Sequence, residues 1–78
     1  MKAKILTNED SLLTMFRLGG IETSKFADDN FEEVFRRSVA DDNLAVLILD
    51  NDSYIKAKGL VDSYRLKNSR PLIVIIGG

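Results

Sequence analysis

The amino-acid sequence predicts an α/β fold with a small, open, four-stranded parallel sheet flanked by helices. Two apolar runs, Leu44–Leu49 and Leu72–Ile76, show no polar alternation, as is typical of strands that helices cover on both faces. Segments with helical spacing of apolar residues separate the strand-like segments, so the order is β-α-β-α-β-α-β. Strands in this order are joined by right-handed crossovers and form a mostly parallel sheet.

The first twenty residues supply one strand and one helix. Residues 3–6 form a short apolar strand, and the apolar residues of 12–18 then follow helical spacing, with Asp10 or Ser11 as the N-cap. Gly19-Gly20 ends this helix, because glycine accepts the left-handed conformation that follows a C-cap.

Residues 21–43 supply the second strand and the second helix. Residues 21–26 predict a weak strand that is polar enough to lie at a sheet edge. Asp28-Asp29-Asn30 opens a helix that Asp41-Asp42-Asn43 ends, and acidic residues in its first turn suit the helix dipole. The apolar stripe of this helix faces a core and consists of Phe31, Val34, Phe35 and Val39.

The last third of the chain contains the two apolar strands with one helix between them. This third helix follows residues 50–53 and includes Gly59, which costs about 1 kcal/mol relative to alanine. Pro71 is acceptable as the first residue of the final strand, and we expect both apolar strands to be fully buried. The inner face of the third helix consists of Ala57, Leu60, Val61 and Tyr64.

The composition indicates a single domain that contains neither His nor Cys. The 78 residues suffice for one domain, 1–78, and 11 Lys and Arg against 12 Asp and Glu exclude the basic face of a nucleic-acid binder. Without His or Cys there is no imidazole base, thiolate or His- or Cys-based metal site. The longest apolar run is far shorter than the roughly 20 residues that span a membrane, and the first residues do not resemble a signal peptide, so we expect a cytoplasmic protein.

Polar residues gather where two predicted strands end, and ligands of open α/β sheets bind at this edge. Residues 8–10 follow the first strand, and Asp50, Asn51 and Asp52 follow the third. One hypothesis is a receiver-like phosphoacceptor signalling domain, in which carboxylates bind Mg²⁺ and Asp50 accepts a phosphoryl group. The lysine that ends a fifth strand in receivers has no counterpart, and helix capping is the simpler interpretation of these acids.

The terminal Gly77-Gly78 suggests a second alternative, because ubiquitin-like and sulfur-carrier proteins of similar length end in Gly-Gly. In those families the dipeptide extends from a polar tail on a β-grasp fold. Here it directly follows an apolar strand, and three helices alternate with four strands, so the organisation disagrees with β-grasp.

The chain resembles the F subunit of A-type and V-type rotary ATPases, which is called the G subunit in bacterial sodium-pumping V-type complexes. The resemblance is carried by Lys4-Ile5-Leu6, by Phe16-Arg17-Leu18-Gly19-Gly20-Ile21, by Leu44–Leu49 and by the proline-led strand Pro71–Ile76. It covers essentially residues 1–76, and its specific local signature is Phe16–Gly20. The order of strands and helices that the chain shares with this family, β-α-β-α-β-α-β, resembles half of a flavodoxin-like or receiver-like domain.

This resemblance implies a non-catalytic component of the central rotor stalk that binds the coiled coil of the D subunit. The separate nucleotide-binding subunits hydrolyse or make ATP, and the F subunit helps couple this reaction to proton or sodium transport. It implies no cofactor, no nucleic acid and no direct insertion into the membrane, to which the complex holds the protein peripherally. Family members carry a further mobile helix after the last strand, which these 78 residues do not include.

Five residues are predicted to lie at the partner interface: Asp10, Arg17, Asp50, Asn51 and Tyr54. Arg17 lies next to Gly19-Gly20, where it either pairs with Glu9 or Asp10 to hold the first loop or reaches a carboxylate of the partner. Tyr54 is predicted as a surface anchor, since tyrosine combines an apolar ring with a polar tip.

Overall fold

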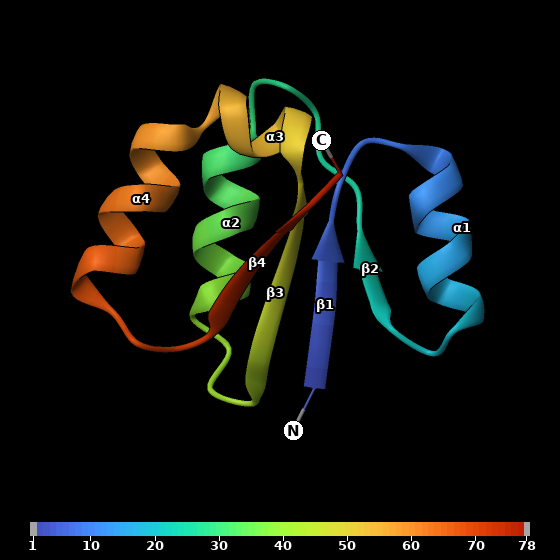
Figure 1. Ribbon diagram of the computed structural model, residues 1–78, viewed down its shortest axis with the longest axis horizontal. Helices are drawn as coiled ribbons and strands as arrows, with labels where there is room; N and C mark the ends of the chain where they lie inside the picture. The colour runs from blue at the N-terminus through green and yellow to red at the C-terminus, as the bar shows by residue number, and fades with distance from the viewer. Residues whose placement is uncertain (1, 78) are drawn as a thin grey trace.

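The computed structural model describes residues 2–77 and shows one open sheet with helices on both sides (Figure 1). All strand pairs are parallel, and the order across the sheet is β2-β1-β3-β4. This confirms the predicted fold class. The elements are β1 (Lys2–Leu6), α1 (Asp10–Leu18), β2 (Glu22–Ser24), α2 (Phe31–Val39), β3 (Leu44–Asp50), α3 (Asn51–Lys56), α4 (Lys58–Lys67) and β4 (Leu72–Ile76).

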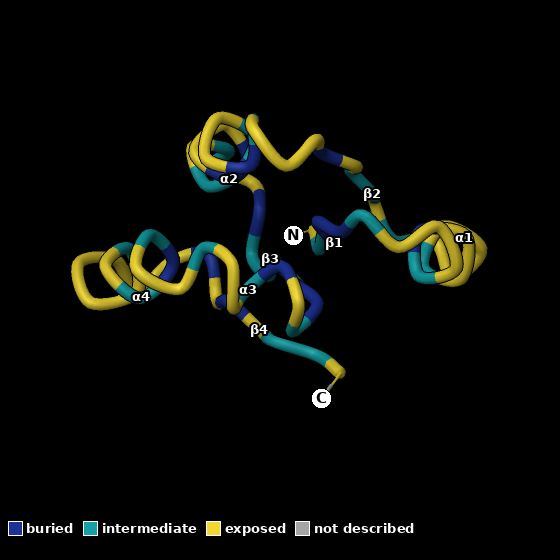
Figure 2. The backbone as a smooth tube through the Cα atoms, turned by 90° about the horizontal axis from the view of Figure 1, so that it is seen from above, coloured by how far each residue is buried: buried dark blue, intermediate teal, exposed yellow. Residues whose placement is uncertain are grey.

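The helices are distributed unequally over the two faces of the sheet. Viewed from above, α2 and α4 lie on one face, α1 lies on the other, beside β2, and the short α3 lies over the end of β3 (Figure 2). The strand order explains this, because the chain moves from β1 outward to β2 and then back across the sheet to β3 and β4. Right-handed crossovers in opposite directions place their helices on opposite faces.

The main core fills the space between the sheet and the layer of α2 and α4. Phe35, Leu47 and Val61 are completely buried there, and the ring of Phe35 meets the ring of Tyr64 edge-on at 5.6 Å between centroids. Within the predicted stripe of α2, Phe31 and Phe35 are buried and the two valines are partly buried. Because each buried apolar side chain contributes about 1.5–3 kcal/mol, this stripe holds α2 on the sheet.

The third predicted helix is two helices, which corrects the sequence analysis. The chain leaves helical geometry at Ala57, with φ −122° and ψ 27°, so α3 ends before this residue and α4 begins after it. Across the break the Tyr54 hydroxyl donates a hydrogen bond to Asp62 Oδ1 at 2.7 Å. Tyr54 of α3 and Tyr64 of α4 both pack on the main core.

The prediction that β3 and β4 are covered on both faces is wrong. Leu72 is 60% exposed and Val74 is 36% exposed, and the side chains of Val46 and Ile48 are only partly buried. Their neighbours along the strands belong to the main core, so these four residues point to the opposite face. On that face α1 packs against β2, and the described residues 2–77 contain no helix over β3 and β4.

Local signals at the ends of α1 and α2 agree with the structure to within two residues. The helix that was expected to follow residues 50–53 begins earlier, at Asn51, with Asp50 as its N-cap. The predicted stop at Gly19-Gly20 is confirmed, since Gly20 has φ +81°, and β2 lies at a sheet edge as expected. The N-caps differ slightly: α1 begins after Glu9 and α2 after Asn30, whose side-chain oxygen accepts the backbone N–H of Ala27 at 2.8 Å.

Candidate interaction surface

The loops that follow β1 and β3 meet at the carboxyl end of the sheet, as predicted. The two strands are neighbours in register, with Leu6 opposite Leu49, so the chain segments after them lie side by side. Together with the end of β4 they border a shallow hollow of about 280 Å³, which we call the acidic hollow. Its lining consists of Glu9, Leu12, Asp50, Asn51, Asp52, Ile76 and Gly77.

Asp50 is the buried member of this group and caps α3. Its Oδ1 accepts the hydroxyl of Ser53 at 2.6 Å, and its Oδ2 accepts the backbone N–H of the same residue at 3.2 Å. Burial by itself raises the pKa of the Asp50 carboxyl, but the hydrogen bonds from Ser53 and Thr7 outweigh it and hold that pKa below its ordinary value. Asp50 is therefore ionised at neutral pH, and its carboxylate caps the first turn of α3.

This geometry supports the capping interpretation of the acidic residues. Both oxygens of Asp50 hold Ser53, and only 8% of the residue is exposed, so the carboxylate is not presented to a phosphodonor. Within residues 2–77 no three acidic side chains are arranged to hold a metal ion. The all-parallel sheet also disagrees with the β-grasp alternative, whose Gly78 lies outside the described residues.

Asp10 and Arg17 lie at opposite ends of α1, about 10 Å apart along its axis. Lys25 forms an ion pair with Asp10 at 3.0 Å, and Arg17 Nη2 donates a hydrogen bond to Thr23 Oγ1 at 3.3 Å. The hypothesis that Arg17 pairs with Glu9 or Asp10 is therefore wrong. Both side chains instead tie α1 to β2 and the residue that follows it.

Tyr54 and Asn51 differ in their surroundings. The Tyr54 ring packs against the main core and its hydroxyl bonds to Asp62, which raises the pKa of Tyr54. Asn51 is half-buried and lines the acidic hollow next to Asp50. The structure thus brings Asp50 and Asn51 together and places Arg17 and Tyr54 elsewhere, and contact of these residues with a partner stays a prediction.

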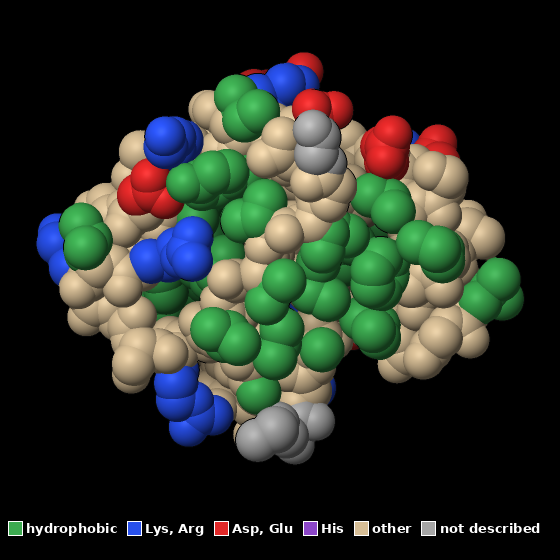
Figure 3. All heavy atoms as spheres, in the orientation of Figure 1, with side chains coloured by type: hydrophobic (Ala, Val, Ile, Leu, Met, Phe, Trp, Pro, Cys, Tyr) green, Lys and Arg blue, Asp and Glu red, His purple; other side chains and the backbone are tan. Residues whose placement is uncertain are grey.

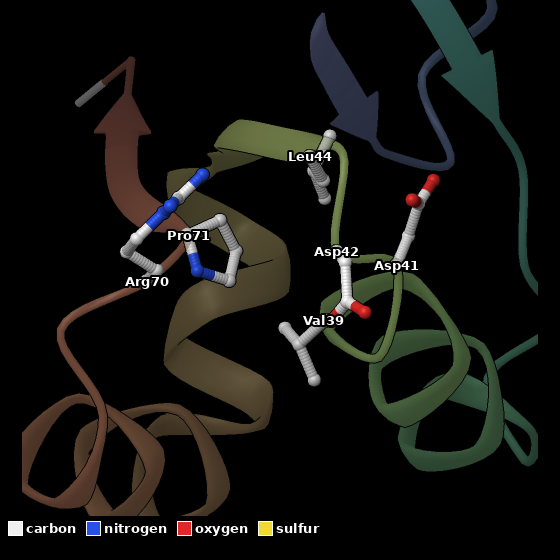
Figure 4. Close-up of a pocket in the computed structure, with 6 residues that line it drawn as sticks. All are labelled: Val39, Asp41, Asp42, Leu44, Arg70 and Pro71. Carbon is white, nitrogen blue, oxygen red and sulfur yellow. The ribbon is translucent and has the colours of Figure 1, made fainter. Parts of the chain in front are cut away.

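A second hollow of about 280 Å³, the amino-end hollow, lies at the opposite end of the sheet (Figure 4). Arg70 and Pro71 lie on one side of it, and Asp41 and Asp42 on the other. Lys2 Nζ lies 2.7 Å from Asp41 Oδ2, and the hydrogen bond from Lys2 holds the pKa of Asp41 below its ordinary value. The sequence analysis singled out no site here, because the lining residues come together only through β3 and β4.

Large apolar side chains of β4 and α1 are exposed on the face of the sheet on which α1 lies. A space-filling view shows hydrophobic side chains gathered between β4 and α1 (Figure 3). They include Leu72 and Val74 of β4, together with Met15 of α1, which is 56% exposed. Sequence analysis missed this surface because it assigned β4 to the interior.

Comparison with known proteins gives one match. No curated protein and no solved structure matches the chain, and none of the helices within residues 2–77 is long and apolar enough to cross a membrane. The model of the family described as ATP synthase (F/14-kDa) subunit matches residues 4–78, which confirms the resemblance inferred from the sequence. The chain therefore belongs to the F/14-kDa subunit family of V/A-type ATP synthases.

Proposed function

We propose that this chain is a non-catalytic component of the central rotor stalk that binds the coiled coil of the D subunit. In this role it helps couple ATP hydrolysis or synthesis in the nucleotide-binding subunits to proton or sodium transport. The complex holds it on the cytoplasmic side, peripheral to the membrane. Membership of the family already implies other subunits of the ATP synthase complex as partners.

The observation that carries this proposal is the family match over residues 4–78, which includes every helix and every strand except the first two residues of β1. Two structural features support a role in docking. Leu72 and Val74 expose apolar surface on a sheet, and apolar surface of this kind marks protein interfaces. A domain of 78 residues also buries a smaller fraction of its unfolded surface than a larger domain does, about 60–65%, so a partner adds stability by mass action.

The experiment is to mix the purified chain with the D subunit from the same source and to measure complex formation. We expect a one-to-one complex that elutes as a single peak in size exclusion and gives a saturable signal in isothermal titration calorimetry at micromolar concentrations. An unrelated antiparallel coiled coil of similar length serves as the control and is expected not to bind. Absence of binding to the D subunit at these concentrations contradicts the proposal.

A further inference from the structure

Within residues 2–77, the part of the sheet that no helix covers forms a continuous apolar surface, which we call the open strip. It consists of Val46 and Ile48 of β3 with Leu72, Val74 and Ile76 of β4. Val46 lies opposite Leu72 and Ile48 opposite Val74 in the strand register, so these side chains form two parallel rows on one face. Figure 3 shows this face, with hydrophobic side chains between β4 and α1.

Helix α1 borders the open strip along one side. Leu12 lines the acidic hollow together with Ile76, and Met15 follows one helical turn later and is 56% exposed. The opposite flank of α1 carries Asp10, which forms an ion pair with Lys25, and Arg17, which donates a hydrogen bond to Thr23. The apolar flank of the helix therefore faces the strip, and the polar flank faces β2.

The dimensions of the open strip suit a single α-helix. Two neighbouring strands and the gap beside them are about 10 Å wide, which is the diameter of a helix with its side chains. The five residues of β4 extend about 16 Å, which corresponds to about three helical turns. A parallel sheet is normally covered by helices on both faces, and one further helix completes the cover of this one.

The charges at one end of the open strip constrain what lies on it. Asp50 is opposite Ile76 in the register, so the strip ends at the acidic hollow, where Glu9 and Asp52 are exposed. Among the residues described, neither of these two carboxylates forms an ion pair shorter than 4 Å. A chain segment lying on the strip therefore meets apolar surface along its length and negative charge at this end.

We propose that the open strip binds one amphipathic α-helix of another subunit of the complex, with an apolar stripe on β3 and β4 and Lys or Arg beside the acidic hollow. This inference rests on the proposed function, which supplies a helical partner, and adds the surface that holds it. Another strongly exposed leucine, Leu66, lies near the end of α4, outside the two rows of the strip and on the other side of the sheet. It provides a matched control.

The test compares Leu72→Asp with Leu66→Asp in binding to the purified D subunit. Both changes place a carboxylate on an exposed leucine, 60% and 88% exposed, on different sides of the sheet. We expect Leu72→Asp to raise the dissociation constant about tenfold or more, because binding then buries a charge against the apolar stripe of the partner. Leu66→Asp is expected to bind as the unchanged chain does.

A milder variant guards against a failure to fold. Val74→Thr keeps the branched shape that suits a strand and adds one hydroxyl to the strip, so we expect it to fold and to bind about threefold or more weakly. Circular dichroism and thermal unfolding of each variant establish that it is folded before binding is measured. If Val74→Thr and folded Leu72→Asp both bind with unchanged affinity, the inference is overturned.

The acidic end is tested by the salt dependence of binding. The double variant Glu9→Gln with Asp52→Asn is expected to reduce the loss of affinity on raising salt, because two charges that attract the basic end of the helix are gone. Asp29→Asn, an exposed acid outside the hollow, is the control and is expected to leave the salt dependence unchanged. If the double variant and the unchanged chain show the same salt dependence, the proposed Lys or Arg of the partner helix does not lie beside the acidic hollow.

The outcomes separate this inference from the proposed function. If the unchanged chain does not bind the D subunit, the proposed function fails. If it binds and the strip variants bind equally well, only the inference fails. If the isolated chain forms a dimer that Leu72→Asp dissociates while binding to the D subunit is unaffected, a second copy occupies the open strip and the inference is likewise overturned.

Discussion

Asp50 Oδ1 and Ser53 Oγ lie 2.6 Å apart, and this short hydrogen bond joins the end of β3 to the first turn of α3. Both residues are buried, with 8% and 5% of their surfaces exposed. Hydrogen bonds to an ionised partner are stronger than neutral ones, so this pair fixes the angle between the sheet and the helix that follows it. It also fixes one wall of the acidic hollow.

Ser53→Ala is expected to raise the pKa of Asp50, because burial then acts with fewer opposing hydrogen bonds. Removal of the hydroxyl also lowers the free energy of unfolding at neutral pH by about 1–3 kcal/mol. NMR titration of the Asp50 carboxyl measures the first effect, and urea unfolding measures the second. Ser63→Ala, an exposed serine of α4, is the matched control and changes neither quantity.

The pH dependence of stability follows from the same group. The folded-state pKa of Asp50 lies below its ordinary value of 3.8, so its contribution is fully present above that value. The contribution is lost as the pH falls through the folded-state pKa. The difference in unfolding free energy between the unchanged chain and Ser53→Ala is therefore largest above about pH 4 and decreases as the pH falls below the ordinary pKa of Asp50. A difference that increases on acidification contradicts this assignment.

Phe35→Ala removes the largest completely buried side chain and leaves a cavity between α2, α4 and the sheet. Such truncations cost about 3–5 kcal/mol, and a domain of this length has about 4–12 kcal/mol in total. We expect a large loss of thermal stability and partial unfolding at 25 °C, both of which circular dichroism measures. Phe35→Leu, which leaves a smaller cavity, should lose clearly less; equal losses would show that packing at Phe35 is not the cause.

Gly59→Ala is expected to stabilise the chain by about 0.5–1 kcal/mol, because alanine favours the helical conformation. A Cβ at Gly59 has no neighbour within 4 Å, so no clash opposes this gain. Gly20→Ala is the informative counterpart, since its Cβ is equally free but φ is +81°. It should destabilise the chain in urea unfolding, and stabilisation at both positions contradicts the argument from backbone conformation.

Lys2→Met is expected to raise the pKa of Asp41 toward its ordinary value. The hydrogen bond from Lys2 is the main cause that lowers this pKa, and the backbone N–H of Asn43 remains as a second, weaker one. NMR titration of the Asp41 side chain measures the shift. Lys58→Met, at the start of α4, is the control for a general change in net charge and leaves the Asp41 titration as it is.

Much of the fold was predictable from local patterns. The alternation of segments predicted a mostly parallel sheet, the stripe Phe31–Val39 predicted the buried face of α2, and Gly19-Gly20 predicted the end of α1. These signals are local, since propensity, periodicity and the special conformations of glycine act over a few residues. The resemblance to the ATPase stalk component likewise depended on short segments in order, and the family match confirms it.

The break at Ala57 was not predictable in the same way. Residues 51–67 are compatible with one continuous helix, since even Gly59 costs only about 1 kcal/mol in a helix. The hydrogen bond from Tyr54 to Asp62 spans the break, and both Tyr54 and Tyr64 pack on the core that α2 shares. These contacts join separate elements, so the local pattern of residues 51–67 does not reveal the helix boundary.

The sequence by itself determined the elements, their order, the parallel sheet and the family of the chain, because these follow from local patterns and from the handedness of crossovers. Only the tertiary structure decided which strand faces are covered. An apolar run such as Leu72–Ile76 has the same pattern whether helices cover one face or both, since the cover comes from distant segments. The α1 crossover lies over β2, and within residues 2–77 no helix covers β3 and β4 on that side, so their apolar side chains stay exposed.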